Sequence, residues 1–397
     1  MKHVSALIIC LFLCYVSKAQ DSLLASVLLQ KLQDEQVKSD SFYKAGMFPS
    51  YRYYGYSPGK AVDDNNIFFT GLIVFTLQGL QPYLHGNDSL LCENIIRQAR
   101  KSYAYFRNIG ERHTYNFWTT HPPLVFPNSW FLNLFKKGNI LPDDLDDTVI
   151  LLMGLEVPDS VAQSVKALME ADANTRTHYI RNTYRKYRHL PAYSTWFGEK
   201  MPIDFDFCVL CNVLYFVNSY GLPMNRHDSA TITLLEDFIR NKEYITAPAY
   251  ISPHYARTPV LIYHVARLMG NFPVPALLKY KPVLVAEAKR LLKKDDNIMD
   301  RIILGSALIW LGQPAEDIHI TADQINSIAG NDFVFFIAGF YSLFPNPFKK
   351  MFSNTPLIKY YYRCPAYNEA LLLQYLILKN KAVKDTNRKH KVLTFVP

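Results

Sequence analysis

A dense group of carboxylates is the feature of this sequence that most suggests chemistry. Asp143, Asp144, Asp146 and Asp147 fall within five positions and directly precede an apolar stretch with helical spacing. One or two aspartates would serve as a helix cap, because free N–H groups and the helix dipole attract negative charge. Four of them repel one another, since Asp144 and Asp147 are three residues apart and share a helix face. Such crowding raises at least one pKa or recruits a cation, so the segment is a candidate site, with structural capping as the alternative.

Two other predicted helices also begin with carboxylates. Asp64 and Asn65 precede one apolar stretch, while Asp204 and Asp206 precede a second that contains Asn212. If these helices belong to one ring, the three acidic starts face a single cavity mouth. We therefore interpret these five side chains as candidates for substrate binding. Ordinary helix capping is the alternative for each start taken alone.

Aromatic side chains near these segments are candidates for the walls of a binding site. They are Phe117, Trp118, Trp130, Trp196, Phe205 and Phe207. Three of them belong to a long loop at residues 113–130, and long ordered loops in compact domains are often functional. Aromatic faces stabilise carbocations by cation–π attraction. They also stack against sugars, so these residues fit two classes of substrate.

Apolar residues recur at helical spacing through most of the chain. We predict helices near residues 21–38, 65–82, 88–107, 145–155, 159–172, 205–220, 229–241, 257–269, 279–293, 297–311, 331–343 and 366–379. Several are apolar on nearly every face, as buried helices are. About twelve helices joined by alternating short and long loops predict an all-α, single-domain (α/α) toroid over residues 20–380, with residues 360–365 closing the ring. A stacked α-solenoid is the alternative, but it predicts a clearer sequence period.

The acidic segment resembles a motif of a known enzyme family. Asp144-Leu145-Asp146-Asp147-Thr148 is similar to the DxDD-T motif of class II terpene cyclases, which are α-toroids. The resemblance implies that Asp146 is a general acid that protonates an alkene or epoxide, while Asp144 and Asp147 keep it protonated and oriented. Such chemistry needs a neutral carboxylic acid in a dry cavity. The substrate would be an isoprenoid or a similar lipid-like small molecule, and no cofactor would be needed.

Three other interpretations remain open. Asp143, Asp144 and Asp147 also match the DDxxD pattern, which in class I terpene synthases binds Mg²⁺ and a diphosphate. An exported glycan-active (α/α)-barrel hydrolase or lyase would use aspartates as acid and base in an open cleft. A non-catalytic binding or scaffold protein of the same fold would have fully paired aspartates and no cavity beside them.

The first nineteen residues have the pattern of a secretory signal peptide. A basic start is followed by an apolar run from Val4 to Val16 and by small residues before a predicted cleavage after Ala19. Removing this segment takes away Lys2 and Lys18, which lowers the formal net charge from +9 to +7. We expect a protein exported to the periplasm or beyond.

The remaining composition limits the classes of partner. Basic residues are spread along the chain apart from a basic C-terminal tail at residues 381–397, which is not the pattern of a nucleic-acid-binding protein. No segment after the leader is long and apolar enough to span a membrane, and nothing identifies a partner protein. Cys92, Cys208, Cys211 and Cys364 would remain after cleavage. The apolar surroundings of Cys208 and Cys211 favour core cysteines, with disulfides as the alternative.

Overall fold

The computed structural model describes residues 21–55, 57–110, 112–129, 142–198, 200–294, 296–316, 318, 320–321 and 324–393. The predicted signal peptide and Trp130 lie outside these residues. None of the described helices is long and apolar enough to cross a membrane.

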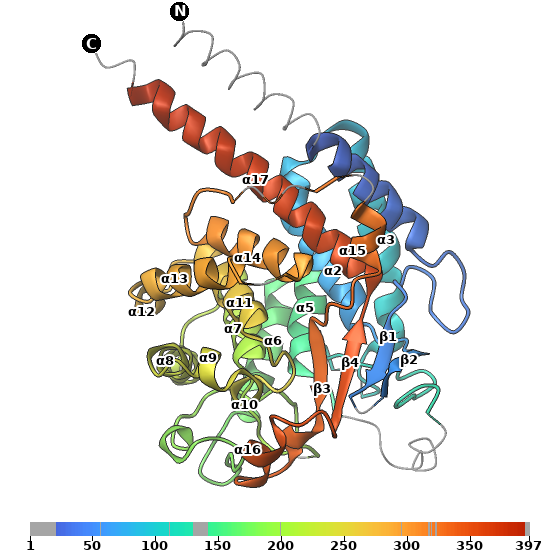
Figure 1. The fold of residues 1–397 in the computed structure, drawn as a ribbon. Helices are drawn as coiled ribbons and strands as arrows, with labels where there is room; N and C mark the ends of the chain where they lie inside the picture. Colours follow the sequence, from blue (N-terminus) through green and yellow to red (C-terminus); the bar gives the residue numbers. More distant parts are fainter. Residues whose placement is uncertain are drawn as a thin grey trace, which may run out of the picture.

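Six helices form a closed inner ring in which each helix packs against the next (Figure 1). They are α2 (Phe68–Leu80), α5 (Leu145–Leu155), α7 (Phe207–Ser219), α11 (Thr258–Asn271), α14 (Ile298–Trp310) and α17 (Pro365–Leu393). The last of them, α17, packs against both α14 and α2, so the chain closes the ring on its first inner helix. This arrangement confirms the predicted (α/α) toroid. It also distinguishes the fold from an open solenoid, whose end helices do not meet.

Outer helices alternate with the inner ones along the chain. They are the helix at residues 21–35, α3 (Gly86–Ser102), α6 (Asp159–Ala171), α8 (Arg226–Arg240), α13 (Lys281–Leu292) and α15 (Ile325–Ala329). Because one outer helix separates consecutive inner helices, all inner helices run in the same direction. The ring therefore has one mouth formed by N-terminal helix ends and another formed by C-terminal helix ends.

Several short helical segments complete the connections between these helices. The α-helical ones are α9 (Glu243–Thr246), α10 (Pro248–Ile251), α12 (Pro275–Leu278) and α16 (Phe348–Phe352). The 3₁₀ segments are η1 (Gln81–Tyr83), η2 (Tyr103–Phe106), η3 (Arg185–Tyr187) and η5 (Phe340–Leu343).

The position of each helix follows from its pattern of apolar residues and caps. Nearly all of α5 and α7 is buried, which accounts for their apolar residues on every face. The outer helix α8 instead buries one face and begins with a capping box between Asn225 and Asp228. The helix α5 begins at the cap Asp144 and ends at Glu156, whose φ of 54° stops the helix in the left-handed conformation.

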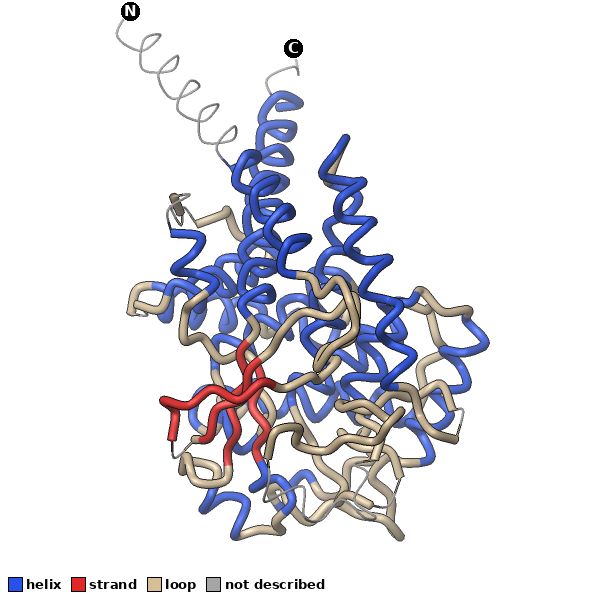
Figure 2. The backbone as a smooth tube through the Cα atoms, turned by 90° about the vertical axis from the view of Figure 1, so that its right-hand side faces the viewer, coloured by secondary structure: helices blue, strands red, loops and turns tan. Residues whose placement is uncertain are grey.

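A small antiparallel sheet lies beside the ring and was not predicted (Figure 2). Its strands are β1 (Tyr51–Tyr54), β2 (Ser57–Asp63), β3 (Phe336–Gly339) and β4 (Lys359–Arg363), in the order β2-β1-β4-β3. The predicted helix at residues 331–343 is therefore wrong, because this segment holds β3 and η5. A short apolar run is compatible with a strand as well as with a helix. Here the segment is a strand because it pairs with β4, where Phe336 lies opposite Tyr362.

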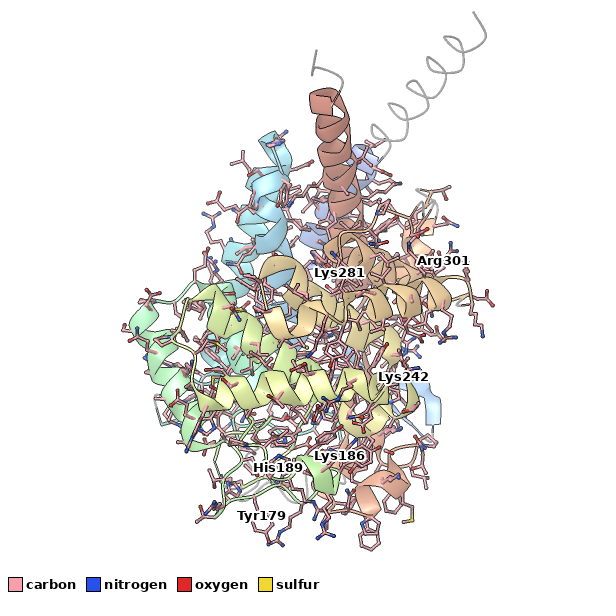
Figure 3. All side chains as sticks on the ribbon, turned by 90° about the vertical axis from the view of Figure 1, so that its left-hand side faces the viewer. Tyr179, Lys186, His189, Lys242, Lys281 and Arg301 are labelled. Carbon is pink, nitrogen blue, oxygen red and sulfur yellow. The ribbon has the colours of Figure 1, made fainter. Side chains whose placement is uncertain are left out.

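The outer surface carries dispersed basic side chains. Figure 3 shows Lys186, Lys242, Lys281 and Arg301 well separated on one face of the molecule. The distribution agrees with the even spread of basic residues along the sequence. At the end of the chain, α17 continues into the segment at residues 381–397 that we describe as a basic tail.

Candidate active site at the N-terminal mouth of the ring

The aspartates of α5 lie almost fully buried at the N-terminal mouth. Their exposed fractions are 7% for Asp144, 3% for Asp146 and 1% for Asp147. The Oδ1 atom of Asp144 accepts hydrogen bonds from the backbone N–H groups of Asp146 at 2.7 Å and Asp147 at 3.2 Å. Asp144 is therefore the N-cap of α5. The cap uses one carboxylate, so it does not explain the presence of Asp146 and Asp147.

Asp143 is held apart from this group by its own partners. Its Oδ2 accepts hydrogen bonds from Asn108 Nδ2 at 2.5 Å and from the Thr114 hydroxyl, and Arg112 Nη2 lies 3.4 Å away. The residues of the DDxxD pattern are thus not brought together as one ligand set. Within the described ranges, no group of three or more His, Cys, Asp or Glu side chains is placed to hold a metal ion.

Asp146 is linked to the neighbouring inner helices through a chain of hydrogen bonds. Its Oδ1 accepts a bond from Asn212 Nδ2 at 2.6 Å, and its Oδ2 accepts one from the Tyr255 hydroxyl. The Oδ1 atom of Asn212 in turn accepts a bond from Arg267 Nη2. The carboxyl group of α5 is thus positioned by residues of α7, α11 and the loop before α11.

Both carboxyl oxygens of Asp147 are buried, and neither has a hydrogen-bond partner among the residues that the structure describes. Burial raises its pKa well above the ordinary value, and the nearby charges of Asp144 and Asp146 raise it further. Burial and the Asp146 charge raise the pKa of Asp144 to about 7, against the opposing effect of His254 and the capping bonds. Burial raises the pKa of Asp146 to about 6, although Tyr255 and Asn212 oppose the shift. Burial and mutual repulsion therefore both favour the protonated form of these carboxyl groups.

His254 joins this acidic group to a second set of buried carboxylates. Its backbone N–H donates to Asp206 Oδ2 at 2.8 Å, and its Nε2 lies 3.6 Å from Asp204 Oδ2. Burial alone would lower the pKa of His254, but the bond to Asp204 and the charges of Asp206, Asp204 and Asp144 raise it. Burial alone would raise the pKa of Asp204, but Lys349, whose Nζ lies 2.8 Å away, and His254 lower it.

The other acidic helix starts have mainly structural contacts. Asp206 caps α7 by accepting bonds from Cys208 N at 2.8 Å and Val209 N at 3.2 Å. Asp64 caps nothing. It pairs with Arg52 Nη1 at 2.5 Å and accepts a bond from Trp118 Nε1 at 2.9 Å.

An aromatic pocket of about 50 Å³ opens onto Asp144. Its walls include Phe117, Trp118, Phe126, Trp196, His254, Phe336 and Tyr362. A smaller cavity of about 10 Å³ touches Asp144, Asp146 and Asp147 together. The rings of Phe117 and Phe336 are stacked with centroids 5.5 Å apart. Ligand pockets commonly measure ~300–1,000 Å³, so a substrate of ordinary size enters only if this aromatic wall moves.

The structure brings together part of the predicted site. Phe117, Trp118 and Trp196 line the pocket, and Asn212 contacts Asp146. Phe205 and Phe207 are core residues, with exposed fractions of 1% and 0%. Asn65 donates a bond to the Phe42 carbonyl at 3.1 Å and does not line the pocket. Trp130 lies outside the described residues.

Sequence reasoning missed four residues that complete the arrangement: His254, Tyr255, Arg267 and Phe336. The single arginine in the largely apolar stretch at residues 259–269 was a usable signal for Arg267, because an unpaired cation is costly to bury. Nothing in the sequence around the other three residues marks them as part of a site.

The four cysteines Cys92, Cys208, Cys211 and Cys364 are buried and free, as core cysteines are.

Comparison with known proteins gives likeness of fold. No protein-family model matches the sequence, and no curated protein sequence does. One similar structure is ent-copalyl diphosphate synthase from Streptomyces platensis, with a TM-score of 0.43, 12% identity and coverage of 82% of this chain but 52% of that chain. This chain thus spans about half the length of that enzyme. Another is an unsaturated glucuronyl hydrolase specific for heparin, with a TM-score of 0.45, 8% identity and coverage of 92% and 97%. Neither activity is assigned to this chain by the likeness.

Proposed function

We propose that this protein is an enzyme that uses a neutral aspartic acid as a general acid on an apolar, lipid-like small molecule. The observation that carries the proposal is that Asp144, Asp146 and Asp147 share one buried cavity under aromatic rings. Among the described residues, none of the three forms an ion pair with a lysine or arginine. A cap needs only Asp144, and a charge-neutralised structural cluster would have cations beside it. A retained proton in an apolar site is what acid catalysis on an alkene requires.

Asp144 is the carboxyl best placed to meet a substrate. It lines both the aromatic pocket and the smaller cavity, and it is the most exposed of the three. Both oxygens of Asp146 instead accept hydrogen bonds from Asn212 and Tyr255. The resemblance to class II terpene cyclases implies Asp146 as the acid, whereas the geometry favours Asp144 as donor with Asp146 and Asp147 behind it.

The proposed step is a proton transfer to a carbon–carbon double bond. The proton leaves the Asp144 carboxylic acid for one alkene carbon, and positive charge develops on the other carbon. The rings of Phe117, Trp118 and Phe336 would stabilise this charge. Return of a different proton from the cation to the Asp144 carboxylate gives an isomerised or cyclised product and restores the acid.

A glycan-active enzyme is the second candidate, supported by an unpartnered donor in the pocket wall. Among the described residues, Trp196 Nε1 is buried without a hydrogen-bond partner, and its side chain lines the pocket. A sugar hydroxyl group would accept a hydrogen bond from this N–H group. Few polar side chains line the pocket, and this favours the apolar substrate over a sugar.

Substrate assays on wild type and on matched variants test the two candidates. Wild type is incubated with isoprenoid alcohols and diphosphates, and separately with unsaturated uronic disaccharides, and the products are analysed by mass spectrometry. We expect isoprenoid conversion that falls by ~10²-fold or more in Asp144→Asn, the size of general-acid effects. Asp143→Asn is the control, because Asp143 is paired outside the pocket.

Two results would contradict this proposal. Conversion of the uronic disaccharides alone supports the glycan-active candidate. Conversion of neither substrate class, or full activity in Asp144→Asn, removes the support for acid catalysis at this pocket.

A further inference from the structure

A second and much larger pocket lies at the opposite mouth of the ring. It has a volume of about 610 Å³, within the range of small-molecule sites. Its walls come from the C-terminal parts of α2, α7, α11 and α14 and from α17. Among its lining residues are Phe75, Tyr215, Arg267, Trp310 and Gln374. The acidic cluster is at the N-terminal ends of the same helices, so this pocket is separate from the candidate active site.

Arg267 is a buried cation in the wall of this pocket, with an exposed fraction of 3%. Its guanidinium carbon lies 4.8 Å from the ring centroid of Phe75 and 5.8 Å from that of Tyr215. Its Nη2 donates to Asn212, and its guanidinium carbon also lies 5.4 Å from the ring centroid of Tyr263, with whose hydroxyl the guanidinium interacts. Among the described residues, the buried Nε and Nη1 atoms have no partner with hydrogen-bond geometry. Throughout the part of the chain that is described, Arg267 forms no ion pair with a carboxylate. A buried cation without a counter-ion is costly, so its free donors favour an anion supplied from outside.

The remaining lining residues fit an anion with an apolar body. None of the residues that line the pocket is an aspartate or glutamate, and Lys381 adds a second positive charge at its edge. Thr76 has an exposed fraction of 2%, and its buried hydroxyl has no hydrogen-bond partner within the described ranges. Phe75, Tyr215 and Trp310 provide aromatic surface for the rest of a ligand.

We propose that this pocket binds an organic anion, a carboxylate or phosphate joined to an apolar or aromatic body, with the anionic group on Arg267. The C-terminal helix dipoles oppose a negative charge here, but their effect falls off within the last turn. A charge-assisted hydrogen bond to the guanidinium is the stronger interaction, and it requires the buried Arg267 side chain to turn toward the pocket. A bound anion would also affect the acidic cluster, because Arg267, Asn212 and Asp146 form one hydrogen-bonded chain.

Isothermal titration calorimetry with matched probes tests this site without any catalytic assay. The probes are 2-naphthoate, 2-naphthyl phosphate, inorganic phosphate and the neutral 2-naphthol, titrated into the full chain at constant ionic strength. We expect at least one naphthyl anion to bind about tenfold more tightly than 2-naphthol, since bonds to a charged group have this strength. The two naphthyl anions distinguish a carboxylate from a phosphate ligand. Equal affinity for anionic and neutral naphthyl probes would overturn the proposal, as would binding of none.

Two variants locate the binding. Arg267→Gln should weaken the naphthyl anion about tenfold and leave 2-naphthol unchanged. If that variant does not fold, Gly79→Trp replaces it, because Gly79 lines the pocket and a Cβ there meets no atom within 4 Å. Gly79→Trp should block both probes, while Gly79→Ala should leave them unchanged. Anion binding unaffected by Arg267→Gln, or by Gly79→Trp, places the anion elsewhere and overturns the proposal.

Discussion

Asp147 and Asp204 are both almost fully buried aspartates, yet their surroundings shift their pKa values in opposite directions. Asp204 accepts bonds from Lys349 at 2.8 Å and Asn182 at 3.0 Å, so its pKa is lowered despite burial. Asp147 has neither partner, and its pKa is raised well above the ordinary value. Burial thus sets the penalty for ionisation, while the presence of a partner decides whether the carboxyl carries a charge.

Replacement of Asp147 by asparagine should stabilise the protein at neutral pH. A carboxyl with a raised pKa binds its proton more tightly in the folded state, so its stabilising contribution is full below the unfolded value of about 4 and is lost as the pH rises. The Asp147→Asn variant lacks this carboxyl, so it does not lose stability in this way as the pH rises. We expect a higher melting temperature than wild type at pH 7, equivalent to ~0.5–2 kcal/mol, and a smaller difference near pH 4.

Circular dichroism melting curves between about pH 4 and 8 measure this effect. Asp204→Asn is the matched control, because it removes a carboxylate whose pKa is lowered by its partners. That variant should be destabilised at pH 7, and its deficit should shrink as the pH falls. Destabilisation of Asp147→Asn at pH 7 would show that its carboxyl is stabilising and charged.

The pH dependence of the proposed activity should show whether the acidic cluster supplies the acid. General-acid catalysis needs the protonated carboxyl, so the rate falls as the pH rises through the pKa of that group. Loss of activity as the pH rises through about 6 to 7 matches the raised pKa values of Asp144 and Asp146, whose titrations affect each other. A rate that is constant from about pH 5 to 8 would argue against either carboxyl as the acid.

At the scale of helices and strands, local patterns predicted the ring and missed the sheet. Inner helices such as α5 were predictable because an apolar sequence with a capping aspartate leaves few alternatives. The strand β3 was not, because its apolar run acquires its conformation from pairing with β4. A similar limit applies to the site. Asp144 and Asp147 are only three residues apart in the sequence, whereas Tyr255 is 109 residues from Asp146, to which it donates a hydrogen bond.

Glycines at the C-terminal ends of two inner helices provide a test of how tightly the ring is packed. A Cβ at Gly270 of α11 would lie 2.6 Å from the Cβ and 3.0 Å from the Cα of Trp310 on α14. These atoms move only if the helices separate. Gly270→Ala should therefore destabilise the protein by ~1–3 kcal/mol, as overpacking does.

Gly79→Ala on α2 is the control for this substitution. A Cβ at Gly79 meets no atom within 4 Å, so the change should be neutral or stabilise by ~0.5–1 kcal/mol through helix propensity. Both free energies of unfolding come from urea denaturation. Equal effects of the two alanines would mean that the contact between α11 and α14 is not close.

At the scale of the whole molecule, ring closure explains why the protein has two distinct mouths. Parallel inner helices place their N-terminal ends around the acidic cluster, where their dipoles and free N–H groups favour carboxylates. The same helices place their C-terminal ends around Arg267, where their dipoles favour a cation. The chain of bonds from Arg267 through Asn212 to Asp146 connects the two ends inside the ring.

Closure of the ring also predicts how the protein unfolds. Phe69 of α2 and Tyr367 of α17 meet where the first and last inner helices pack, with ring centroids 5.9 Å apart and exposed fractions of 1% each. Phe69→Ala should cost ~3–5 kcal/mol, the usual range for a buried phenylalanine. Because each inner helix depends on two neighbours, this loss should shift a single transition for the whole ring. Far-UV circular dichroism and tryptophan fluorescence should give the same urea midpoint.

The exposed Leu90 on α3 provides the control, since 66% of it is accessible and Leu90→Ala should change the stability by less than about 0.5 kcal/mol. An open stack of helices would behave differently from a closed ring. In an open stack, loss of a packing contact at the terminal helix would unfold α17 first and leave the other helices folded. Two separated transitions in Phe69→Ala would therefore show that α17 is an appended helix whose loss the other five inner helices tolerate.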